Sequence, residues 1–577
     1  MNKNPIHPGW LAREKLLRDV PENWADAIRQ KVEPLLKYGW NGFDAGVEYT
    51  RDVVAELDNL VLPASATDAD INDHAAARVR RVREIISLPC SSASLHDSLN
   101  RHCINNRLAP PNEKIVQHAR LARMLDPYWW RRGLRRVQAR DIEGAAIKLG
   151  FVHAKAQKYV SEESFQRRAQ QARRNRKMLE STIMMNEDGD QFTLAKLSDK
   201  TVANPHLRRG EMMLRIRGFE ELAKSRGDAC LFATVTCPSR MHAKRYQSGE
   251  GNPHYDGTTP REAQDYLCQL WARTRSAIMR AGLVTYGFRI AEPHHDGCPH
   301  WHLLLFVEDG HADGQSLQLL QSTLSRYALA DSPNEPGAQE RRCRFERIDL
   351  KNGSAAGYVA KYISKAVGLD VQSSTPRNNH SSRVPAWAST HGIRQFQQIG
   401  GAPVGLWREL RKVPYEALGK RPPKALSDSW KAANRTDKTK CDFSAFLTAT
   451  GGVTIKRKQR KLRIAWQWSD REGKYGEPIG DEPVGVLVTG RTKIYASVRR
   501  VWQIVTPWTR VNNCTRLTAQ NLGNIVRSEL VKDTKHHPPP KERHHEPPHP
   551  RFNPKIQPHT VNPGDNARTQ RRAQTSL

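Results

Sequence analysis

Short apolar runs alternate with longer amphipathic segments most clearly between about residues 228 and 368. Runs rich in β-branched and aromatic residues predict strands, whereas apolar residues three and four apart predict helices. In chain order, the pattern predicts a strand, a helix, two strands, a helix, a strand and a final helix, at residues 230–237, 259–282, 283–292, 300–307, 315–329, 343–350 and 354–368. The order β-α-β-β-α-β predicts an α+β domain with a ferredoxin-like antiparallel sheet and helices on one face.

Local signals mark several of the boundaries between these elements. Thr259 and Glu262 form a capping box at the start of the first predicted helix, and Gly282 can close its end. Ser354 can cap the last helix. The turn HHDGCP, residues 294–299, separates the second and third strands, so these two strands are expected to pair as a hairpin.

The chain divides by composition into four regions. Residues 1–200 are basic and mostly helical in pattern, and residues 228–425 hold the central domain with a Trp-rich, basic extension. Residues 430–530 contain short apolar runs and predict a small mixed accessory domain of unknown fold. Residues 532–577 are rich in Pro, His and Arg and poor in aromatic residues, so this tail is expected to be disordered.

The net charge of the chain indicates what kind of partner it binds. The 577 residues carry a formal charge of +32, which indicates a polyanionic partner. Nucleic acid is expected rather than a membrane, because no apolar run reaches the roughly 18–20 residues that a membrane span needs. The N-terminal sequence lacks the apolar core of a secretory signal, and nine scattered cysteines favour a reducing cytoplasm over a disulfide-linked protein.

Two histidines in the third predicted strand are candidate metal ligands. His300 and His302 lie two apart, so both point to one face of the strand, and two imidazoles make half of a metal site. Glu292 ends the preceding strand and faces this one across the turn, which makes its carboxylate the expected third ligand. His294 and His295 are alternatives for that position. The competing interpretation is that both strand histidines are structural side chains within the sheet.

The donor set bears on which ion would bind. Mg²⁺ usually prefers oxygen ligands, so a site with two histidines suits Mn²⁺ at least as well. Cys298, two residues before His300, is a further candidate ligand, although a turn residue of the hairpin is the simpler interpretation. The sequence thus predicts a divalent metal, Mg²⁺ or Mn²⁺.

Two tyrosines in the last predicted helix are candidate nucleophiles. Tyr358 and Tyr362 are four apart, so both phenols lie on one helix face, with Lys361 and Lys365 beside them. A phenol has a pKa near 10 and is a poor nucleophile at neutral pH, but nearby lysines and a metal favour the phenolate. Paired histidines and paired tyrosines together predict metal-assisted attack on a phosphodiester. Taken alone, the tyrosines could be an aromatic stripe packed on the sheet.

A dense cationic run in the N-terminal region is a candidate contact for DNA phosphates. Lysine and arginine attract phosphates regardless of base sequence. A solvated helix face is the alternative interpretation. The run consists of Arg167, Arg168, Arg173, Arg174, Arg176 and Lys177.

Several of these strings resemble the HUH-type rolling-circle replication endonucleases, in which two histidines flank a bulky hydrophobe. The closer resemblance is to the phage replication gene A protein family, whose members have two catalytic tyrosines. The resembling strings are PHWHLLLF, which carries Trp301 between its histidines, the two-tyrosine motif YVAKYISK, FATVTCPS at Phe232–Ser239, and WASTHGIRQFQQIGG at Trp387–Gly401. The similar stretch runs from about Cys230 to Leu410.

The resemblance implies the same fold and a specific reaction. It implies a site- and strand-specific single-strand DNA endonuclease and strand transferase that starts rolling-circle replication of a phage or prophage. Cleavage would leave a 5′-phosphotyrosine and a free 3′-OH, and a second tyrosine would allow a second cut while the first link persists. The implied partners are single-stranded or supercoiled origin DNA and host replication helicase and polymerase, in the bacterial host cytoplasm.

Two other functions are compatible with the sequence. A conjugative relaxase or single-strand transposase would share the chemistry, and some relaxases carry a helicase signature; the chain contains no GxxxxGK[ST] string. A non-catalytic, basic DNA-binding protein is the other alternative, and it would leave a supercoiled plasmid closed.

Overall fold

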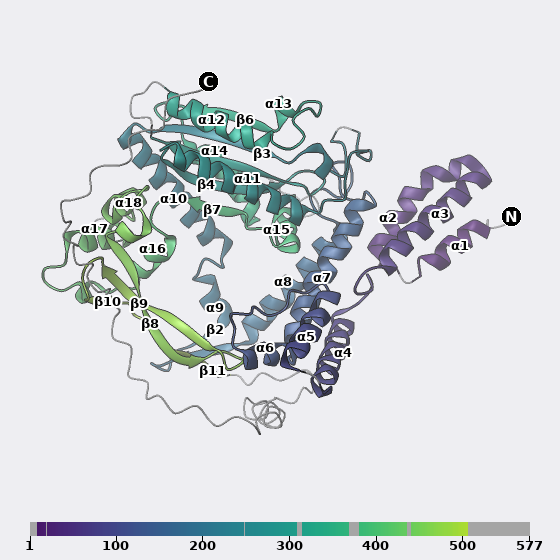
Figure 1. Ribbon diagram of the computed structural model, residues 1–577, viewed down its shortest axis with the longest axis horizontal. Coiled ribbons are helices and arrows are strands. Elements are labelled where there is room, and N and C mark those ends of the chain that lie inside the picture. The colour runs from purple at the N-terminus through teal and green to yellow at the C-terminus, as the bar shows by residue number, and fades with distance from the viewer. Residues whose placement is uncertain are drawn as a thin grey trace, which may run out of the picture. The chain divides into compact units, whose positions relative to one another are not determined.

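The computed structural model describes residues 8–505, except for residues 19, 90, 247, 309–313, 369–379 and 436–439. The described residues all lie in one compact unit of the chain (Figure 1). The predicted disordered tail, residues 532–577, lies outside the described residues.

The N-terminal part of the chain is mainly helical (Figure 1). Its helices are α1 (Pro8–Leu16), α2 (Glu22–Val32), the 3-10 helix η1 (Glu33–Tyr38), α3 (Gly39–Asp58), α4 (Asp68–Ser87), α5 (Ser92–Asn105), α6 (Gln117–Met124), α7 (Pro127–Lys148), α8 (Glu162–Ser181), α9 (Leu194–Asp199) and α10 (Pro205–Arg226). A small antiparallel sheet joins two strands of this region to a strand far along the chain, namely β1 (Ile183–Asn186), β2 (Gln191–Thr193) and β11 (Trp502–Ile504).

The largest sheet among the described residues has five antiparallel strands. Its strand order is β6-β3-β5-β4-β7. The strands are β3 (Ala229–Thr236), β4 (Thr285–Pro293), β5 (Pro299–Val307), β6 (Cys343–Ile348) and β7 (Phe396–Ile399). The helices that connect or follow them are η2 (Ser239–Met241), α11 (Pro260–Arg280), α12 (Gln315–Ala328), α13 (Ala338–Arg341) and α14 (Ala355–Val367). The predicted order β-α-β-β-α-β followed by a helix is confirmed, and β7 is added at one edge.

The local signals in the sequence form the contacts that they predict. Thr259 and Glu262 make both hydrogen bonds of the capping box at the start of α11. Strands β4 and β5 pair as an antiparallel hairpin, with Glu292 directly opposite His300. Ser354 caps α14 by accepting a hydrogen bond from the backbone N–H of Gly357.

The sheet carries helices on both faces, so the prediction of helices on one face is wrong. One core contains residues of α11 and α12 together with Leu303 and Leu305 of β5. The other contains residues of α10 and α14 together with Leu304 and Phe306 of the same strand. The continuous apolar run in β5 is typical of a strand that is buried on both sides.

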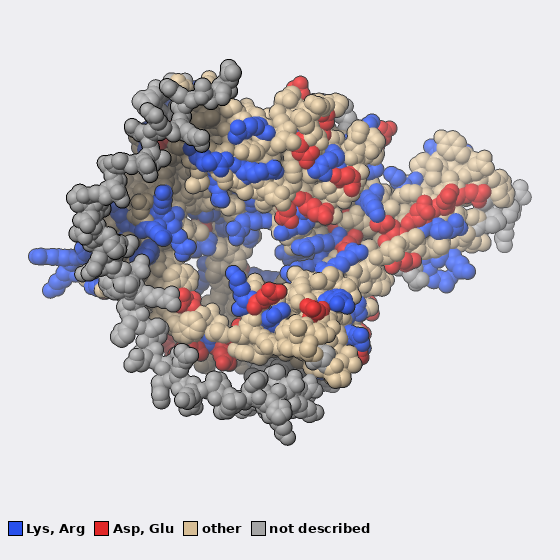
Figure 2. Space-filling model, viewed as in Figure 1, with Lys and Arg blue, Asp and Glu red and all other residues tan. Residues whose placement is uncertain are grey.

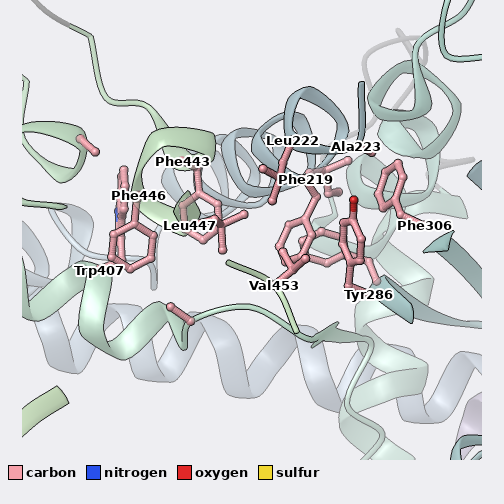
Figure 3. Close-up of a cluster of buried hydrophobic side chains, with 14 of the residues drawn as sticks. Phe219, Leu222, Ala223, Tyr286, Phe306, Trp407, Phe443, Phe446, Leu447 and Val453 are labelled. Carbon is pink, nitrogen blue, oxygen red and sulfur yellow. The ribbon is translucent and has the colours of Figure 1, made fainter. Parts of the chain in front are cut away.

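Figure 3 shows the second core, in which aromatic side chains from distant segments meet. Phe219 of α10 packs against Tyr286 of β4, with ring centroids 5.6 Å apart. Trp407 and Phe446 pack edge to face, with centroids 5.1 Å apart. Such aromatic contacts join α10, the central sheet and the segments that follow the sheet in sequence.

Helix α15 (His380–His391) precedes β7, and its Ala386, Trp387 and Ala388 belong to the core that contains α11 and α12. The region after β7 contributes to the core that contains α14. Its elements are α16 (Val404–Leu410), the 3-10 helices η4 (Tyr415–Leu418) and η5 (Arg457–Gln459), α17 (Lys424–Ala433), α18 (Phe443–Thr450), β8 (Leu462–Glu472), β9 (Pro478–Val488) and β10 (Ile494–Ala496). The last three form an antiparallel sheet of order β10-β9-β8. Leu462, Val486 and Tyr495 from these strands belong to the core that contains α14. Among the described helices, none has the length and apolar character that crossing a bilayer would require.

Candidate active site

The two histidines and Glu292 lie together on the face of the sheet that α14 covers. The Nε2 atoms of His300 and His302 are 3.1 Å apart, and His302 Nε2 lies 3.8 Å from Glu292 Oε2. One potential ligand atom from each of the three side chains lies within 4.8 Å of the others. The grouping follows from the β4–β5 register, which places Glu292 opposite His300 and the second histidine two residues further along β5.

Burial sets the protonation of these three groups. It lowers the pKa of His302 to about 3, with a further contribution from Lys365 and Lys361. It lowers the pKa of His300 well below the ordinary value, so both imidazoles are neutral at pH 7 and offer lone pairs. Burial also raises the pKa of Glu292 to about 7, against the opposing positive charges of the same lysines.

The donor set fits a divalent cation. Glu292 Oε1 and His300 Nδ1 are buried polar atoms without a hydrogen-bond partner in the described part of the chain. Buried polar atoms are normally paired, and unpaired ones call for an explanation such as an ion. Two neutral imidazoles and one carboxylate are ligands that Mn²⁺ accepts, whereas Mg²⁺ would need additional oxygen ligands.

Strand β3 supports the histidine that lies closest to the tyrosine helix. Thr234 pairs with His302 across the two strands, and its Oγ1 is 3.0 Å from His302 Nδ1. The Phe232 ring stacks on the same imidazole, with centroids 5.4 Å apart and planes 17° apart. The contact between Thr234 Oγ1 and His302 Nδ1 orients the imidazole and leaves Nε2 of His302 for a ligand. The sequence reasoning missed both residues, although they alternate along a predicted strand and therefore share its face.

The alternative ligands occupy other places around the hairpin turn. His294 packs beside His300, with ring centroids 4.2 Å apart, and His295 contacts the ring of Tyr246. Cys298 is buried in the turn. The ligand group found among the described residues contains none of the three candidates His294, His295 and Cys298.

An ion pair between His242 and Asp296 holds the turn between β4 and β5. His242 Nδ1 lies 3.1 Å from Asp296 Oδ2, and the His242 ring packs against His294. Burial alone would raise the pKa of Asp296, but His242 outweighs it and holds the pKa well below its usual range. Burial likewise opposes the charged form of His242, whose pKa is nevertheless raised by Asp296. The pair ties the segment after β3 to the turn that carries His294.

Hydrogen bonds at the N-terminal end of α14 join this tyrosine-bearing helix to α10. The carboxylate of Glu220 on α10 accepts hydrogen bonds from the backbone N–H of Ala356, at 2.9 Å, and from the Ser354 hydroxyl, at 3.2 Å. A carboxylate at this end of a helix also complements the helix dipole. Gly368 adopts the left-handed conformation and ends the helix after its two tyrosines.

The two tyrosines occupy different environments on the same helix face. The Tyr362 ring is half-buried and lies 4.2 Å, centroid to centroid, from the ring of His302. Tyr358 is 41% exposed and its hydroxyl donates a hydrogen bond to Glu346 on β6. Both phenol rings contact Phe232, at centroid distances of 5.8 Å for Tyr358 and 5.7 Å for Tyr362.

The pKa values of both phenols are raised in the protein alone, despite the lysines on the same helix. Burial, followed by Glu292 and Glu346, raises the pKa of Tyr362. The hydrogen bond to Glu346 is the main cause of a raised pKa at Tyr358. Lys361 Nζ lies 4.9 Å from the centre of the Tyr362 ring, but this exposed ammonium does not offset burial and the acidic neighbours. Both phenols are therefore protonated at neutral pH.

The cationic run lies on α8, and half of its side chains already have partners within the protein. Arg167 bonds to Glu163, Arg174 pairs with Asp68 at 3.0 Å, and Arg176 pairs with Asp199 at 2.9 Å. The other three side chains of the run are exposed, and the described residues include no ion-pair partner for any of them. These three are Arg168, Arg173 and Lys177. Figure 2 shows further Lys and Arg side chains spread over the face that is drawn.

The residues that carry the histidine and tyrosine motifs match a described family. Residues 87–370 match the model of the bacteriophage replication gene A protein. The replication protein of Haemophilus phage HP1 is 34% identical over 432 residues, which cover 69% of this chain and 53% of that protein. The replication gene A protein of Escherichia phage P2 is 32% identical over 439 residues, covering 70% of this chain and 56% of that protein.

A relative with an enzymatic name matches to a similar extent. The probable replication endonuclease from a prophage-like region of Salmonella paratyphi A is 34% identical over 467 residues, which cover 73% of this chain and 56% of that protein. The chain thus spans between half and two thirds of the length of these relatives. No solved structure matches the chain. With its histidine pair, its tyrosine pair and the strands that hold them, the segment 87–370 belongs to the bacteriophage replication gene A protein family.

Proposed function

We propose that this chain is a metal-dependent tyrosine endonuclease and strand transferase that nicks origin DNA to start rolling-circle replication of a phage or prophage. The observation that carries the proposal is the Tyr362 ring, 4.2 Å from the ring of His302, on the sheet face that also holds His300 and Glu292. A nucleophile beside a candidate metal group is the arrangement that transesterification of a phosphodiester needs. The proposal includes a ferredoxin-like HUH core, which the strand order β6-β3-β5-β4 supports.

The metal would be held by His300, His302 and Glu292. When bound there, Mn²⁺ or Mg²⁺ would withdraw charge from the scissile phosphate and favour loss of the phenol proton. Thr234 and Phe232 keep the His302 imidazole in place, so that its orientation does not depend on the ligand.

In the first step, Tyr362 Oη attacks the phosphorus of the scissile phosphate. The new bond is a 5′-phosphotyrosine, the bond to the 3′-oxygen breaks, and the 3′-oxygen leaves to become a free 3′-OH. One phosphoester replaces another, so the strand can be rejoined without an external energy source. Lys361 and Lys365 are exposed beside the phenol and would neutralise charge on the phosphate.

We assign the first cut to Tyr362 and the second to Tyr358. Tyr362 is half-buried against His302, whereas Tyr358 is more exposed and bonded to Glu346 on the edge strand β6. A second cut by Tyr358 would release a 3′-OH that attacks the phosphate on Tyr362. That attack joins the strand and frees Tyr362.

Replication from the freed 3′-OH would require partners. We propose host replication helicase and polymerase for this role, acting with the protein on its origin in the cytoplasm of a bacterial host. The names of these relatives refer to replication, which supports this role over plasmid transfer or transposition.

A nicking assay tests the proposed function. Supercoiled DNA that carries the origin should be converted to the open circular form in Mn²⁺ or Mg²⁺, and protein should remain attached after denaturation. EDTA should prevent both changes. Retarded but fully supercoiled DNA under all conditions would identify a binding protein without nuclease activity.

The unpaired cations of α8 are proposed to contact DNA phosphates, and salt dependence tests this. Replacing Arg168, Arg173 and Lys177 together by alanine should make affinity less dependent on salt. The negative slope of log affinity against log salt should become shallower by about 2, since each phosphate contact contributes about 0.7–0.9. The matched control replaces Arg174 and Arg176, whose charges are engaged by Asp68 and Asp199. We expect the control to change the slope by less than about 1. Equal slopes for the triple variant and the parent protein would remove α8 from the DNA interface.

A further inference from the structure

We propose that Glu346 is a catalytic residue, the general base that accepts the hydroxyl proton of Tyr358 when this tyrosine makes the second cut. The inference rests on the proposed function and assigns a residue to its second step. It is based on where β6 places a carboxylate and on what that carboxylate contacts.

The register of the sheet places Glu346 on the site face. On β6 it pairs with Phe232 of β3, whose ring packs against His302 and both tyrosines. Strand β6 is an edge strand, and the Glu346 side chain is exposed there. The carboxylate therefore lies beside the tyrosine helix, where a DNA strand could reach it.

Glu346 contacts the nucleophilic oxygen of Tyr358 itself. The Tyr358 hydroxyl donates a hydrogen bond to Glu346 Oε1. Arg347 is adjacent in sequence, yet no ion pair of Glu346 is found among the described residues. A carboxylate bonded to a nucleophilic hydroxyl is the arrangement of a general base with its nucleophile.

The two tyrosines would therefore lose their protons by different routes. Tyr362 lies beside the proposed metal ligands, and no hydrogen bond from its hydroxyl is found among the described residues. Tyr358 has a carboxylate in contact with its hydroxyl. Of the titratable groups around Tyr358, Glu346 on β6 and Tyr362 on its own helix act on its pKa, and both raise it. A neutral Tyr358 would thus persist until a phosphate is in place, when the carboxylate can take its proton.

The second step balances with this assignment. The bond between Tyr358 Oη and phosphorus forms, the bond to the 3′-oxygen of the second site breaks, and the phenol proton moves to Glu346. The released 3′-oxygen then attacks the phosphate on Tyr362. In that reaction the new 3′–5′ phosphodiester forms and the Tyr362 oxygen leaves.

Single-tyrosine variants isolate the effect of Glu346. The substrate is a single-stranded oligonucleotide that spans the cleavage site mapped in the nicking assay, and the readout is covalent adduct on a denaturing gel. In a Tyr362→Phe background, where Tyr358 is the remaining nucleophile, Glu346→Gln should slow adduct formation about a hundredfold at pH 7. Without the base, the proton must leave to solvent, so the rate should rise with pH between 7 and 9 more steeply than that of Tyr362→Phe alone. In a Tyr358→Phe background, Glu346→Gln should add less than about a twofold change, because the effects of coupled residues are not additive.

Glu340→Gln is the matched control, because it removes an exposed carboxylate shortly before β6 that no contact joins to either tyrosine. It should match its parent at every pH, and all variants should keep the parental melting temperature. Equal rates and equal pH profiles for Tyr362→Phe with and without Glu346→Gln would overturn the assignment.

If Tyr362→Phe forms no adduct, the test moves to strand transfer by the otherwise wild-type chain. Glu346→Gln should slow this transfer about a hundredfold, and an unchanged rate would again overturn the assignment. Failure of the proposed function is distinct, because then the parent chain itself would form no adduct.

Discussion

Replacing His300 or His302 by alanine is expected to slow DNA strand cleavage about a thousandfold, equivalent to about 4 kcal/mol of transition-state stabilisation. Each substitution removes one of two imidazole nitrogens that lie 3.1 Å apart and leaves Glu292 with a single histidine partner. Two ligands would hold a divalent ion weakly, so the scissile phosphate would keep its full charge during attack.

The histidine prediction has a binding readout in addition to activity. Titration of Mn²⁺, followed by electron paramagnetic resonance, should show one bound ion for the parent chain and much weaker binding for either variant. The matched control is His254→Ala, which changes an exposed imidazole outside the ligand group. Parental cleavage by both histidine variants, or parental cleavage in EDTA, would remove the metal from the mechanism.

Replacing both Tyr358 and Tyr362 by phenylalanine is expected to abolish the covalent adduct with DNA. Phenylalanine keeps the ring contacts with Phe232 and His302 and removes only the nucleophilic oxygen, so folding and DNA binding should persist. No residual rate is expected, because the attacking atom is absent in both positions.

The single tyrosine variants should differ from each other. Tyr358→Phe should cut a single-stranded origin oligonucleotide near the parental rate and fail to complete strand transfer. Tyr362→Phe should cut at least about tenfold more slowly, because Tyr362 is the tyrosine whose ring contacts His302, whereas the Tyr358 hydroxyl is bonded to Glu346. Equal cleavage rates for the two variants would contradict the assigned order, and an adduct formed by the double variant would place the nucleophile elsewhere.

The hairpin that carries the candidate ligands could be predicted because its signals are local. A short turn, residues 294–298, between two apolar runs fixes the pairing of β4 with β5, and a spacing of two places His300 and His302 on one face. The same turn brings Glu292 opposite His300. Likewise, a spacing of four in a capped helix is sufficient to place Tyr358 and Tyr362 together.

Contacts between distant segments could not be predicted in this way. Thr234 meets His302, and Glu346 meets Phe232, only because β3 lies between β5 and β6 in the sheet. Glu346 also reaches Tyr358 because α14 packs on that face of the sheet. The raised pKa values of both phenols also depend on burial and on acidic neighbours that the spacing of residues within α14 does not reveal. Helices cover both sheet faces because α10, which precedes β3, packs beside α14.

The packing of the accessory region, residues 430–530, also could not be predicted from the sequence. The strands of residues 430–530 could be expected from their apolar runs, but their packing could not, because the core that they join is assembled from α10, α14 and β4. The partners of Arg167, Arg174 and Arg176 show the same limitation. A cationic run in sequence does not reveal which charges are neutralised by folding.

The most direct test of the central claim is mass spectrometry of the covalent complex. The Tyr358→Phe chain is incubated with a single-stranded origin oligonucleotide and Mn²⁺, digested with a protease and a nuclease, and the nucleotide-bearing peptide is sequenced. We predict a nucleotide joined through its 5′-phosphate to Tyr362. Attachment to any other residue, or cleavage that leaves no covalent protein–DNA bond, would contradict the account.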